Sequence, residues 1–210
     1  MTRLYLVRHG ETVWNSEVRI QGHRDIPLSE LGRRQARLLA QRLAAVALDA
    51  AYASDLQRAA QTAAVILAGR GLAAWPCPEL READFGRWEG LTYPEVTALF
   101  PAEQAARRRR PAEVAPTGGE LLPDMLRRVQ QMIAGVLGKH PGGNVLVVSH
   151  GGPLRVLLGS LLGLGLESYW KMRVDNCSLS IVDTYPEGAI VSLLNDTCHL
   201  DELPPGGNVP

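Results

Sequence analysis

The sequence predicts an α/β fold: a three-layer α/β/α sandwich with a mostly parallel central sheet and an inserted cap region. Short apolar runs alternate with longer segments whose apolar residues repeat at helical spacing. The 210 residues suffice for one domain with an ample core. A stretch at about 75–120 breaks the alternation and is rich in Pro, Trp, Gly and charge. We therefore expect a single domain over residues 1–210, with this stretch inserted over the sheet edge to cover the substrate.

The first half of the chain supplies two predicted strands and two predicted helices. They are a strand at about Leu4–Val7, an amphipathic helix over Ser29–Val46, a strand at Ala51–Ala53 and an alanine-rich helix over Asp55–Leu67. We expect Ser54 or Asp55 to cap the second helix, because a side-chain oxygen there can accept a hydrogen bond from a free backbone N–H.

The second half repeats the alternation and adds two late strands. The predicted elements are a helix over Leu121–Leu137, a strand at Val145–Val148, a helix over Pro153–Leu164, and strands near Ser178–Val182 and Ala189–Leu194. Strands that are joined through helices are typical of a parallel sheet with both faces covered.

The first apolar run ends in Arg8-His9-Gly10. Ligands of open α/β sheets bind beyond the carboxyl ends of the strands, so an imidazole and a guanidinium lie where a ligand is expected. Gly10 allows the backbone to approach an anion closely. The guanidinium of Arg8 matches phosphate oxygens and stays charged at any working pH. The tripeptide suits phosphoryl chemistry, although a structural or surface role explains a lone His-Arg pair equally well.

The same arrangement recurs far downstream, where an apolar run ends in Ser149-His150-Gly151. If the two strands are parallel neighbours, His9 and His150 face each other across one pocket, because parallel strands end at the same edge of a sheet. Two unrelated histidines at the core edge are the alternative, since the sequence does not show the strand order.

A third candidate, Arg58, falls in the first turn of the helix predicted over Asp55–Leu67. A helix N-terminus and a guanidinium both favour an anion, whereas an Arg in a first turn is mismatched with the helix dipole. The mismatch favours a ligand-binding role over that of a solvated helix residue.

These residues together resemble the histidine phosphatase superfamily, which includes the cofactor-dependent phosphoglycerate mutases and many small phosphatases. The resemblance covers nearly the whole chain, with the motifs in the family's order. The matching residues are Arg8-His9-Gly10-Glu11-Thr12, Trp14-Asn15, Gln21-Gly22, Asp25, Pro27-Leu28-Ser29, Gly32, Gln35-Ala36, Ser54-Asp55-Leu56, Arg58-Ala59, Gln61-Thr62-Ala63, Leu80-Arg81-Glu82, Phe85-Gly86, Trp88-Glu89-Gly90, Gly118-Gly119-Glu120, His150-Gly151 and Asn195-Asp196-Thr197.

The resemblance implies a catalytic role for the two histidines and the arginines. His9 would be the nucleophile that takes up the phosphoryl group. Arg8, Arg58 and His150 would form the phosphate pocket, which Asn15 joins.

The resemblance also implies a general acid and base, Glu82, which would protonate the leaving oxygen and then activate the water that attacks phosphohistidine. A surface glutamate is the alternative for this residue. Gln21, Gly22 and Gly151 complete the implied substrate-binding set.

The chemistry of these side chains agrees with the implied mechanism. His9 must be neutral to attack, and neighbouring cations disfavour its protonation. An alkoxide leaves poorly without a proton, which a carboxyl group in a partly enclosed site can supply near neutral pH. A cationic pocket would stabilise the transferred group as magnesium does in other phosphoryl-transfer sites. We therefore expect neither a metal nor another cofactor.

The resemblance leaves two other functions open. A cofactor-dependent phosphoglycerate mutase would use the same phosphohistidine but pass the phosphoryl group to a sugar-acid hydroxyl. Mutases of the superfamily carry a longer insertion between the Glu82 region and the late Gly-Gly-Glu, so the resemblance favours a phosphatase. A non-catalytic module that binds a phosphorylated ligand is the third hypothesis, but it should lack the nucleophile or the acid.

A metal site is the rival interpretation of the histidines. The five are His9, His23, His140, His150 and His199. The chain has no His-Glu-x-x-His and no Cys-x-x-Cys motif, and Arg8 would repel a cation next to His9. We expect His140 to end a helix and His23 to lie in a loop near the pocket mouth, whereas His199 is ambiguous.

The charge balance points to a small-molecule partner. The chain has 22 basic and 22 acidic residues, so no net field attracts nucleic acid. The basic run Arg107–Arg110 is interpreted as a solvated surface, with contact to an anionic part of a substrate as the alternative. The aromatic and apolar residues Trp88, Leu91, Tyr93 and Phe100 either line the region that chooses the substrate or pack in the core.

The remaining features concern location and assembly. Cys77, Cys177 and Cys198 lack motif spacing, and Met1-Thr2-Arg3 leads into a strand rather than a signal peptide, so a reducing cytoplasm is expected. The longest apolar stretch, around Val156–Leu166, is too short to cross a bilayer, and no membrane partner is expected. A homodimer is compatible with the sequence, which leaves the oligomeric state open. The Gly- and Pro-rich tail Leu203–Pro210 is expected to fray or to close over a substrate.

Overall fold

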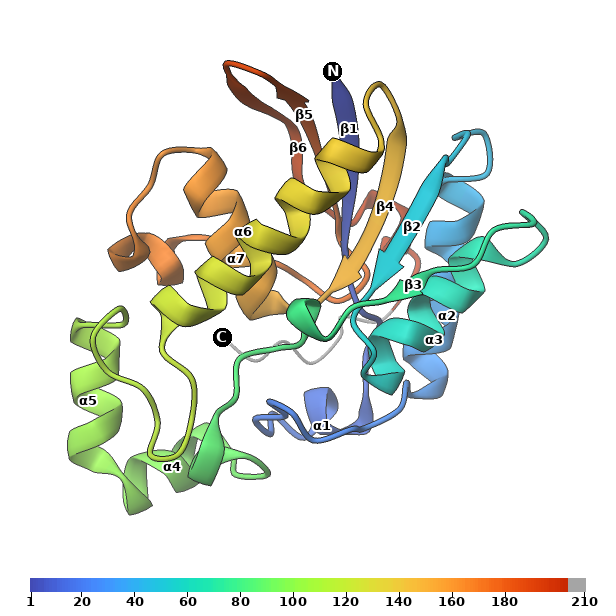
Figure 1. The fold of residues 1–210 in the computed structure, drawn as a ribbon. Coiled ribbons are helices and arrows are strands. Elements are labelled where there is room, and N and C mark those ends of the chain that lie inside the picture. Colours follow the sequence, from blue (N-terminus) through green and yellow to red (C-terminus); the bar gives the residue numbers. More distant parts are fainter. Residues whose placement is uncertain (204–210) are drawn as a thin grey trace.

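The computed structural model describes residues 1–203 and contains one six-stranded sheet. The strands follow the order β3-β2-β4-β1-β5-β6 across the sheet (Figure 1). Their bounds are Thr2–Arg8 for β1, Ala50–Ala53 for β2, Trp75–Pro76 for β3, Asn144–Ser149 for β4, Leu179–Tyr185 for β5 and Gly188–Asp196 for β6. The two-residue β3 is absent from the sequence prediction, because a Trp-Pro pair carries no strand periodicity.

The pairing of β1 with β4 fixes the relative position of the two histidine motifs. The strands are parallel neighbours, and Arg8 lies opposite Ser149. His9 and His150, one residue further along, therefore leave the sheet side by side, as expected for adjacent parallel strands. On the other side of β1, β5 runs antiparallel, and β6 runs antiparallel to β5, so the sheet is only mostly parallel.

Helices cover both faces of the sheet and complete the predicted three layers (Figure 1). Alternate residues of β1 point to opposite faces: Leu4 and Leu6 into one core cluster, Tyr5 and Val7 into the other. The first cluster packs against α6 and α7, the second against α2 and α3. The helices span Glu30–Arg42 (α2), Gln57–Leu67 (α3), Leu122–Lys139 (α6) and Gly151–Leu161 (α7).

Several helix ends differ from the sequence prediction; α7, for example, spans Gly151–Leu161 rather than Pro153–Leu164. Helix α2 ends at Arg42 rather than Val46. Helix α3 begins two residues later than expected, with Leu56 at the N-cap position and no side-chain cap, so the prediction of Ser54 or Asp55 was wrong. The carboxylate of Asp55 is instead bound by the guanidinium of Arg81, with 2.8 Å between Nε and Oδ1.

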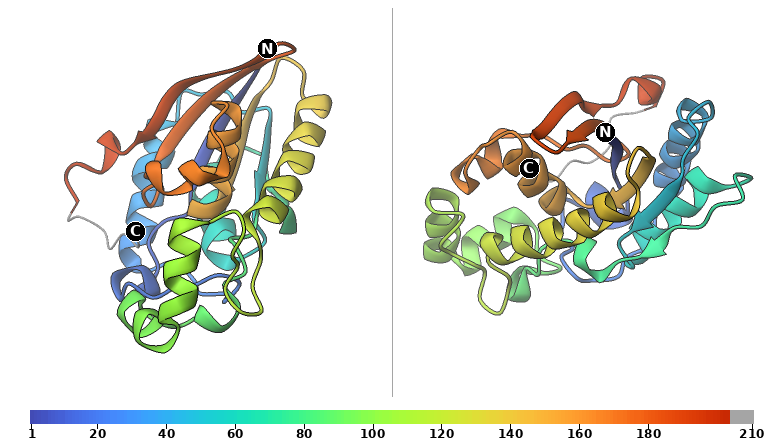
Figure 2. Two further views of the ribbon diagram at one scale, coloured as in Figure 1. Left: turned by 90° about the vertical axis from the view of Figure 1, so that its left-hand side faces the viewer. Right: turned by 45° about the horizontal axis from the view of Figure 1, so that its top comes forward.

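The segment expected to form a cap lies beyond the carboxyl edge of the sheet. Figures 1 and 2 show its two helices, in green, below the ends of β1, β2 and β4. Ile20, Trp88 and Val96 form a small core of their own there. The elements of this end of the molecule are α1 (Val13–Ser16), η1 (Pro78–Leu80), η2 (Gly86–Trp88), α4 (Tyr93–Leu99) and α5 (Pro101–Arg109).

The late chain adds two short 3-10 helices, η3 (Leu166–Lys171) and η4 (Cys198–Leu200). Within residues 1–203, none of the helices has the length and apolar character needed to cross a membrane. Apart from Leu203, the predicted tail lies outside the described residues.

The loop that carries His9 is docked on α2 at a point where only glycine fits. A Cβ on Gly32 would lie 2.0 Å from the carbonyl oxygen of Glu11, and a Cβ on Gly10 would lie 2.6 Å from the carbonyl oxygen of Gly32. Gln35 accepts a hydrogen bond from the backbone N–H of Glu11 across the same contact. The close approach of two backbones thus positions the residues that follow β1.

We expect Gly32→Ala to lower the free energy of unfolding by about 1–3 kcal/mol, because the added methyl group forces the two backbones apart. Gly135→Ala is the matched control. Gly135 is exposed on α6 with no atom near its Cβ position, so alanine there should stabilise by about 0.5–1 kcal/mol through its better helix propensity. Urea unfolding followed by circular dichroism measures both. Equal effects of the two substitutions would contradict the proposed contact.

Candidate active site

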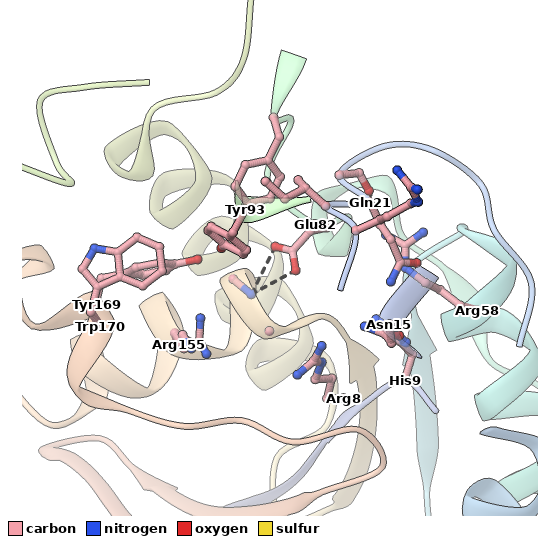
Figure 3. A pocket seen from close by; sticks show the side chains of 16 residues that line it. Arg8, His9, Asn15, Gln21, Arg58, Glu82, Tyr93, Arg155, Tyr169 and Trp170 are labelled. Carbon is pink, nitrogen blue, oxygen red and sulfur yellow. Dashed lines mark hydrogen bonds between the residues drawn. The ribbon is translucent and has the colours of Figure 1, made fainter. Parts of the chain in front are cut away.

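A small cavity of about 60 Å³ lies at the carboxyl ends of β1 and β4 (Figure 3). Its lining comes from the end of β1, from α1 and the loop after it, and from α3, the cap, α7 and η3. Of the sequence-predicted site residues, all but one line it: Arg8, His9, Asn15, Gln21, Gly22, Arg58, Glu82 and Gly151. The exception, His150, is completely buried, and its ring lies next to that of His9.

The ring of His9 is oriented by its own loop. Its Nδ1 lies 2.7 Å from the carbonyl oxygen of Gly10, which can only accept a hydrogen bond, so the proton resides on Nδ1 and the lone pair on Nε2. Burial, together with the charges of Arg58 and Arg8, holds the pKa of His9 well below its usual range. The site therefore holds a neutral imidazole with Nε2 free to act as a nucleophile.

His150 has the opposite tautomer. Arg58 Nε donates to His150 Nδ1 over 3.1 Å, which places the ring proton on Nε2. Burial, Arg58 and His9 hold the pKa of His150 well below its usual range. The ring centroids of the two histidines are 5.0 Å apart. Nε2 of His150 has no hydrogen-bond partner among residues 1–203, so this neutral imidazole offers one N–H donor to an anion held beside His9.

The two arginines are fixed by backbone carbonyl groups. Arg8 donates from Nη1 to the carbonyl of Val174 over 2.6 Å. Arg58 donates to the carbonyls of Arg24 and Gly22, each over 2.8 Å. Burial lowers the pKa of each guanidinium to about 10, so both remain charged at neutral pH. Among residues 1–203, no carboxylate is hydrogen-bonded to either guanidinium, and two such fixed cations favour a doubly charged anion between them.

Polar side chains complete the phosphate end of the cavity. Asn15 is buried in the capping box of α1, where its Oδ1 accepts from the backbone N–H of Thr12. Its amide nitrogen is therefore the end that remains to donate to a ligand. Gln21 is buried, and its Oε1 has no partner within the described part of the chain. Gly22 contributes the carbonyl that holds Arg58.

Glu82 lies between the two ends of the cavity. Figure 3 shows its carboxylate between His9 and Arg58 on one side and Arg155, Tyr169 and Trp170 on the other. The backbone N–H of Gly152, at the start of α7, donates to both carboxylate oxygens at 3.1 and 3.2 Å. A Cβ on Gly152 would lie 2.1 Å from Oε1, so only glycine permits this contact. Glu82 is thereby anchored to the turn that follows His150.

The backbone of Glu82 is held by residues from another part of the sequence. Arg128 on α6 donates to the carbonyls of Arg81 and Glu82, and its guanidinium is paired with Glu120. His23 Nε2 lies 3.0 Å from the same carbonyl of Glu82. His23 is in a turn next to the cavity, as predicted, and the Gly118-Gly119-Glu120 motif acts on the site through Arg128.

Several residues of the cavity were not predicted from the sequence. They are Arg19, Ile20, Phe85, Gly152, Arg155, Tyr169 and Trp170. Gly152 could have been identified from the sequence, because it is the second of two consecutive glycines after His150. Of the aromatic and apolar candidates, Tyr93 lines this cavity and also packs against the cap core. Trp88 belongs to that core and lines an adjoining cavity, whereas Leu91 and Phe100 pack against the core.

The interpretation of Arg107–Arg110 as a solvated surface was wrong for its first residue. Arg107 is only 2% exposed, because its guanidinium lies over the ring of Phe85 and binds the carbonyl of Val114. The other three arginines are exposed. The buried face of a helix is recognised when residues of one type recur every three or four positions. Four consecutive arginines show no such recurrence, so the sequence does not indicate which of them is buried.

The other histidines lie apart from the site. His140 is the C-cap of α6, as predicted, and its Nε2 hydrogen-bonds the hydroxyl of Tyr52. His199 contacts the carbonyl of Cys177 and the guanidinium of Arg42. Within residues 1–203, no three His, Cys, Asp or Glu side chains gather in a way that suits a metal ion.

The two imidazoles should differ in tautomer and share an unusual resistance to protonation. Nitrogen-15 NMR of histidine-labelled protein should show Nδ1–H on His9 and Nε2–H on His150. Both rings should be neutral at pH 6.5, where an exposed imidazole is half protonated, because a lowered pKa shifts protonation to more acidic pH. The urea-unfolded protein is the control, in which all five histidines should titrate normally. A doubly protonated His9 at pH 6.5 would contradict the tautomer assignment.

Comparison with known proteins shows the family. The sequence model of the histidine phosphatase superfamily (branch 1) matches residues 4–197. Phosphoserine phosphatase 1 of Hydrogenobacter thermophilus is 37% identical over 203 residues, which are 97% of this chain and 96% of the relative. The probable phosphoglycerate mutase GpmB of Yersinia pestis is 39% identical over 213 residues, with 96% of each chain covered.

Solved structures agree with this result. YhfR of Bacillus stearothermophilus superposes with a TM-score of 0.91 at 35% identity, covering 96% of this chain and all of that one. The α-ribazole phosphatase of Shigella flexneri gives 0.85 at 34% identity, with 93% and 96% covered. A mycobacterial glucosyl-3-phosphoglycerate phosphatase gives 0.85 at 32% identity, with 92% and 98% covered. The chain belongs to the histidine phosphatase superfamily and, like its phosphatase relatives, is a phosphomonoesterase.

Proposed function

We propose that the protein hydrolyses phosphomonoesters of small metabolites, without a metal ion, through a phosphohistidine intermediate on His9. The observation that carries the proposal is the free Nε2 of a neutral His9 next to two fixed guanidinium groups and the N–H of His150. In the first step, Nε2 attacks phosphorus, a P–N bond forms, and the P–O bond to the leaving group breaks. Arg8, Arg58 and His150 bind the phosphoryl oxygens during the transfer.

Glu82 serves both steps as proton donor and acceptor. In the first step its carboxyl group gives a proton to the leaving oxygen, so that an alcohol departs rather than an alkoxide. In the second step the resulting carboxylate takes a proton from a water molecule, which attacks phosphorus and breaks the P–N bond. Inorganic phosphate leaves, and both His9 and Glu82 return to their starting state. The place of Glu82 in the cavity, opposite His9, supports this role (Figure 3).

A phosphoglycerate mutase is the second candidate, favoured by the name of one relative. Between Trp88-Glu89-Gly90 and Gly118-Gly119-Glu120 the chain has room for only α4 and α5, which supports the phosphatase assignment. A non-catalytic module is disfavoured because His9 and Glu82 are both present. The unpaired state of the described cysteines Cys77, Cys177 and Cys198 suits a reducing cytoplasm, where we place the enzyme.

The chemistry is tested by phosphate release from p-nitrophenyl phosphate, 3-phosphoglycerate and α-ribazole phosphate with EDTA present. We expect EDTA-resistant release of inorganic phosphate. Conversion of 3-phosphoglycerate to its 2-isomer without release would assign a mutase instead.

His9→Ala should lower kcat by a factor of about 1,000 or more while the fold remains, because the nucleophile is lost. Mass spectrometry under alkaline conditions should detect a phosphorylated His9 peptide in the wild-type protein during turnover. His140→Gln is the matched control, since His140 lies at the far end of α6 from the cavity. Full activity of His9→Ala would refute the mechanism.

Glu82→Gln tests general acid catalysis through the leaving group. An alkyl phosphate needs a proton on its leaving oxygen, whereas p-nitrophenolate leaves without one. The substitution should therefore lower kcat/KM for glycerol 3-phosphate by about 100-fold or more, and that for p-nitrophenyl phosphate by much less. Glu79→Gln, an exposed glutamate three residues earlier, is the control. An equal loss of kcat/KM on both substrates would show that Glu82 is not the general acid.

A further inference from the structure

Glu82, the proposed general acid, lies in a segment without regular secondary structure. Residues 81–85 connect η1 to η2 and form neither helix nor strand. The carbonyl groups of such a segment are not fixed by a helical turn or a strand ladder, so they depend on other hydrogen-bond partners. The position of the Glu82 carboxyl group in the cavity therefore depends on what holds this backbone.

Arg128 on α6 holds the segment with a guanidinium whose hydrogen-bonding capacity is fully used. Its Nη1 donates to the carbonyls of Glu79 and Arg81 over 2.5 and 2.8 Å, and its Nη2 donates to that of Glu82 over 3.1 Å. Nε and Nη2 also bind the two carboxylate oxygens of Glu120, each over 2.7 Å. A guanidinium has five N–H groups, and here each of the five has an acceptor. These contacts fix its orientation, and with it the backbone carbonyls that it binds.

Glu120 supports the same segment in two ways. Its carboxylate orients and neutralises the guanidinium of Arg128, and its backbone N–H donates to the carbonyl of Asp84 over 2.8 Å. The preceding glycine permits this close approach, because a Cβ on Gly119 would lie 2.5 Å from the same carbonyl oxygen. The Gly-Gly-Glu motif thus packs directly against residues 81–85.

A second arginine of α6 shows how an ordinary surface ion pair differs from this arrangement. Arg127 binds Asp124 over 2.7 Å, and the two side chains are 64% and 48% exposed. The side chains of Arg128 and Glu120 are only 21% and 17% exposed. A bidentate pair that is shielded from solvent has a defined geometry, whereas exposed pairs contribute little. Arg127 therefore provides a matched comparison for Arg128.

The carboxyl group of Glu82 is tied both to its own backbone and to α7. Its Oε1 accepts from the backbone N–H of Ala83 over 2.8 Å, and the N–H of Gly152 binds both oxygens. A shift of the segment would move Ala83 but not Gly152, and would draw the carboxyl group away from α7. Proton transfer requires hydrogen-bond reach, so a displacement of about 1 Å is enough to slow it.

We propose that Arg128 and Glu120 are positioning residues of the phosphomonoesterase reaction, and that they act through Glu82. Together they hold the backbone of Glu82 where its carboxyl group can reach the leaving oxygen. Neither side chain belongs to the cavity lining formed by residues 1–203. The inference rests on the proposed role of Glu82 and extends it to the residues that make this role possible.

The test compares two phosphomonoesters that differ in their need for an acid. Glycerol 3-phosphate needs a proton on its leaving oxygen, whereas p-nitrophenyl phosphate releases a stable phenolate. The quantity measured is the ratio of kcat/KM for the first ester to kcat/KM for the second. This ratio does not depend on the fraction of the protein that folds.

Arg128→Lys should lower the ratio by about tenfold or more, because a misplaced catalytic group can reduce the rate by up to about 100-fold. The lysine keeps the positive charge near His150 but has only three donors, which cannot replace the planar fork. Glu120→Gln is a milder change, since one side-chain oxygen remains as an acceptor, and should lower the ratio by about threefold or more. It also tests the inference if Arg128→Lys yields little folded protein.

A double-variant cycle shows whether Arg128 acts through Glu82. Combined with Glu82→Gln, Arg128→Lys should leave the ratio within about twofold of that of Glu82→Gln alone, because an acid that is absent cannot be displaced. A fall of the ratio as large as that caused in the wild-type background would overturn the inference.

Arg127→Lys is the matched control and should keep the wild-type ratio. An unchanged ratio in both Arg128→Lys and Glu120→Gln would overturn the inference while the phosphatase activity stands. No phosphate release from either ester by the wild-type enzyme would reject the phosphatase activity itself, and the inference with it.

Discussion

The parallel pairing of β1 with β4 is the constraint on which the active site depends. It brings two residues that are 141 positions apart in the chain, His9 and His150, to a ring separation of 5.0 Å. The cations around them are held by carbonyl oxygens of the backbone, whereas arginines such as Arg3 and Arg128 pair with carboxylates. Because neither guanidinium has a carboxylate as hydrogen-bond partner in the described part of the chain, Arg8 and Arg58 keep their charge for a ligand. The same few strands and helices thus determine both where the two histidines lie and which charges surround them.

Much of the fold and of the phosphate end could be predicted from the sequence. Both histidines follow uninterrupted apolar strands, and an apolar run that ends in His-Gly is a local signal. Arg58 was identified by its mismatch with the helix dipole. Local periodicity also located the long helices, although several of their ends differ. At the start of α3, for example, Asp55 binds Arg81 instead of capping the helix.

The rest of the site depends on contacts that no local pattern records. Glu82 was found through the resemblance alone, since its anchor on Gly152 joins segments that are distant in sequence. Arg107 has three arginine neighbours in sequence, and only the placement of Phe85 and Val114 decides which of the four is buried. The same holds for the aromatic residues of η3, because the sequence there is equally compatible with packing in the core and with lining a cavity. Substrate choice is therefore the part of the function that tertiary structure had to supply.

The central place of β1 has a consequence for synthesis of the protein. Its strand partners, Asn144–Ser149 and Leu179–Tyr185, are made long after it. During translation, β1 leaves the ribosome before these partners and must wait without them until they have emerged. Contacts of such sequence separation form slowly and leave apolar strand edges exposed in the meantime. The surroundings of His9 therefore form only as the last third of the chain folds.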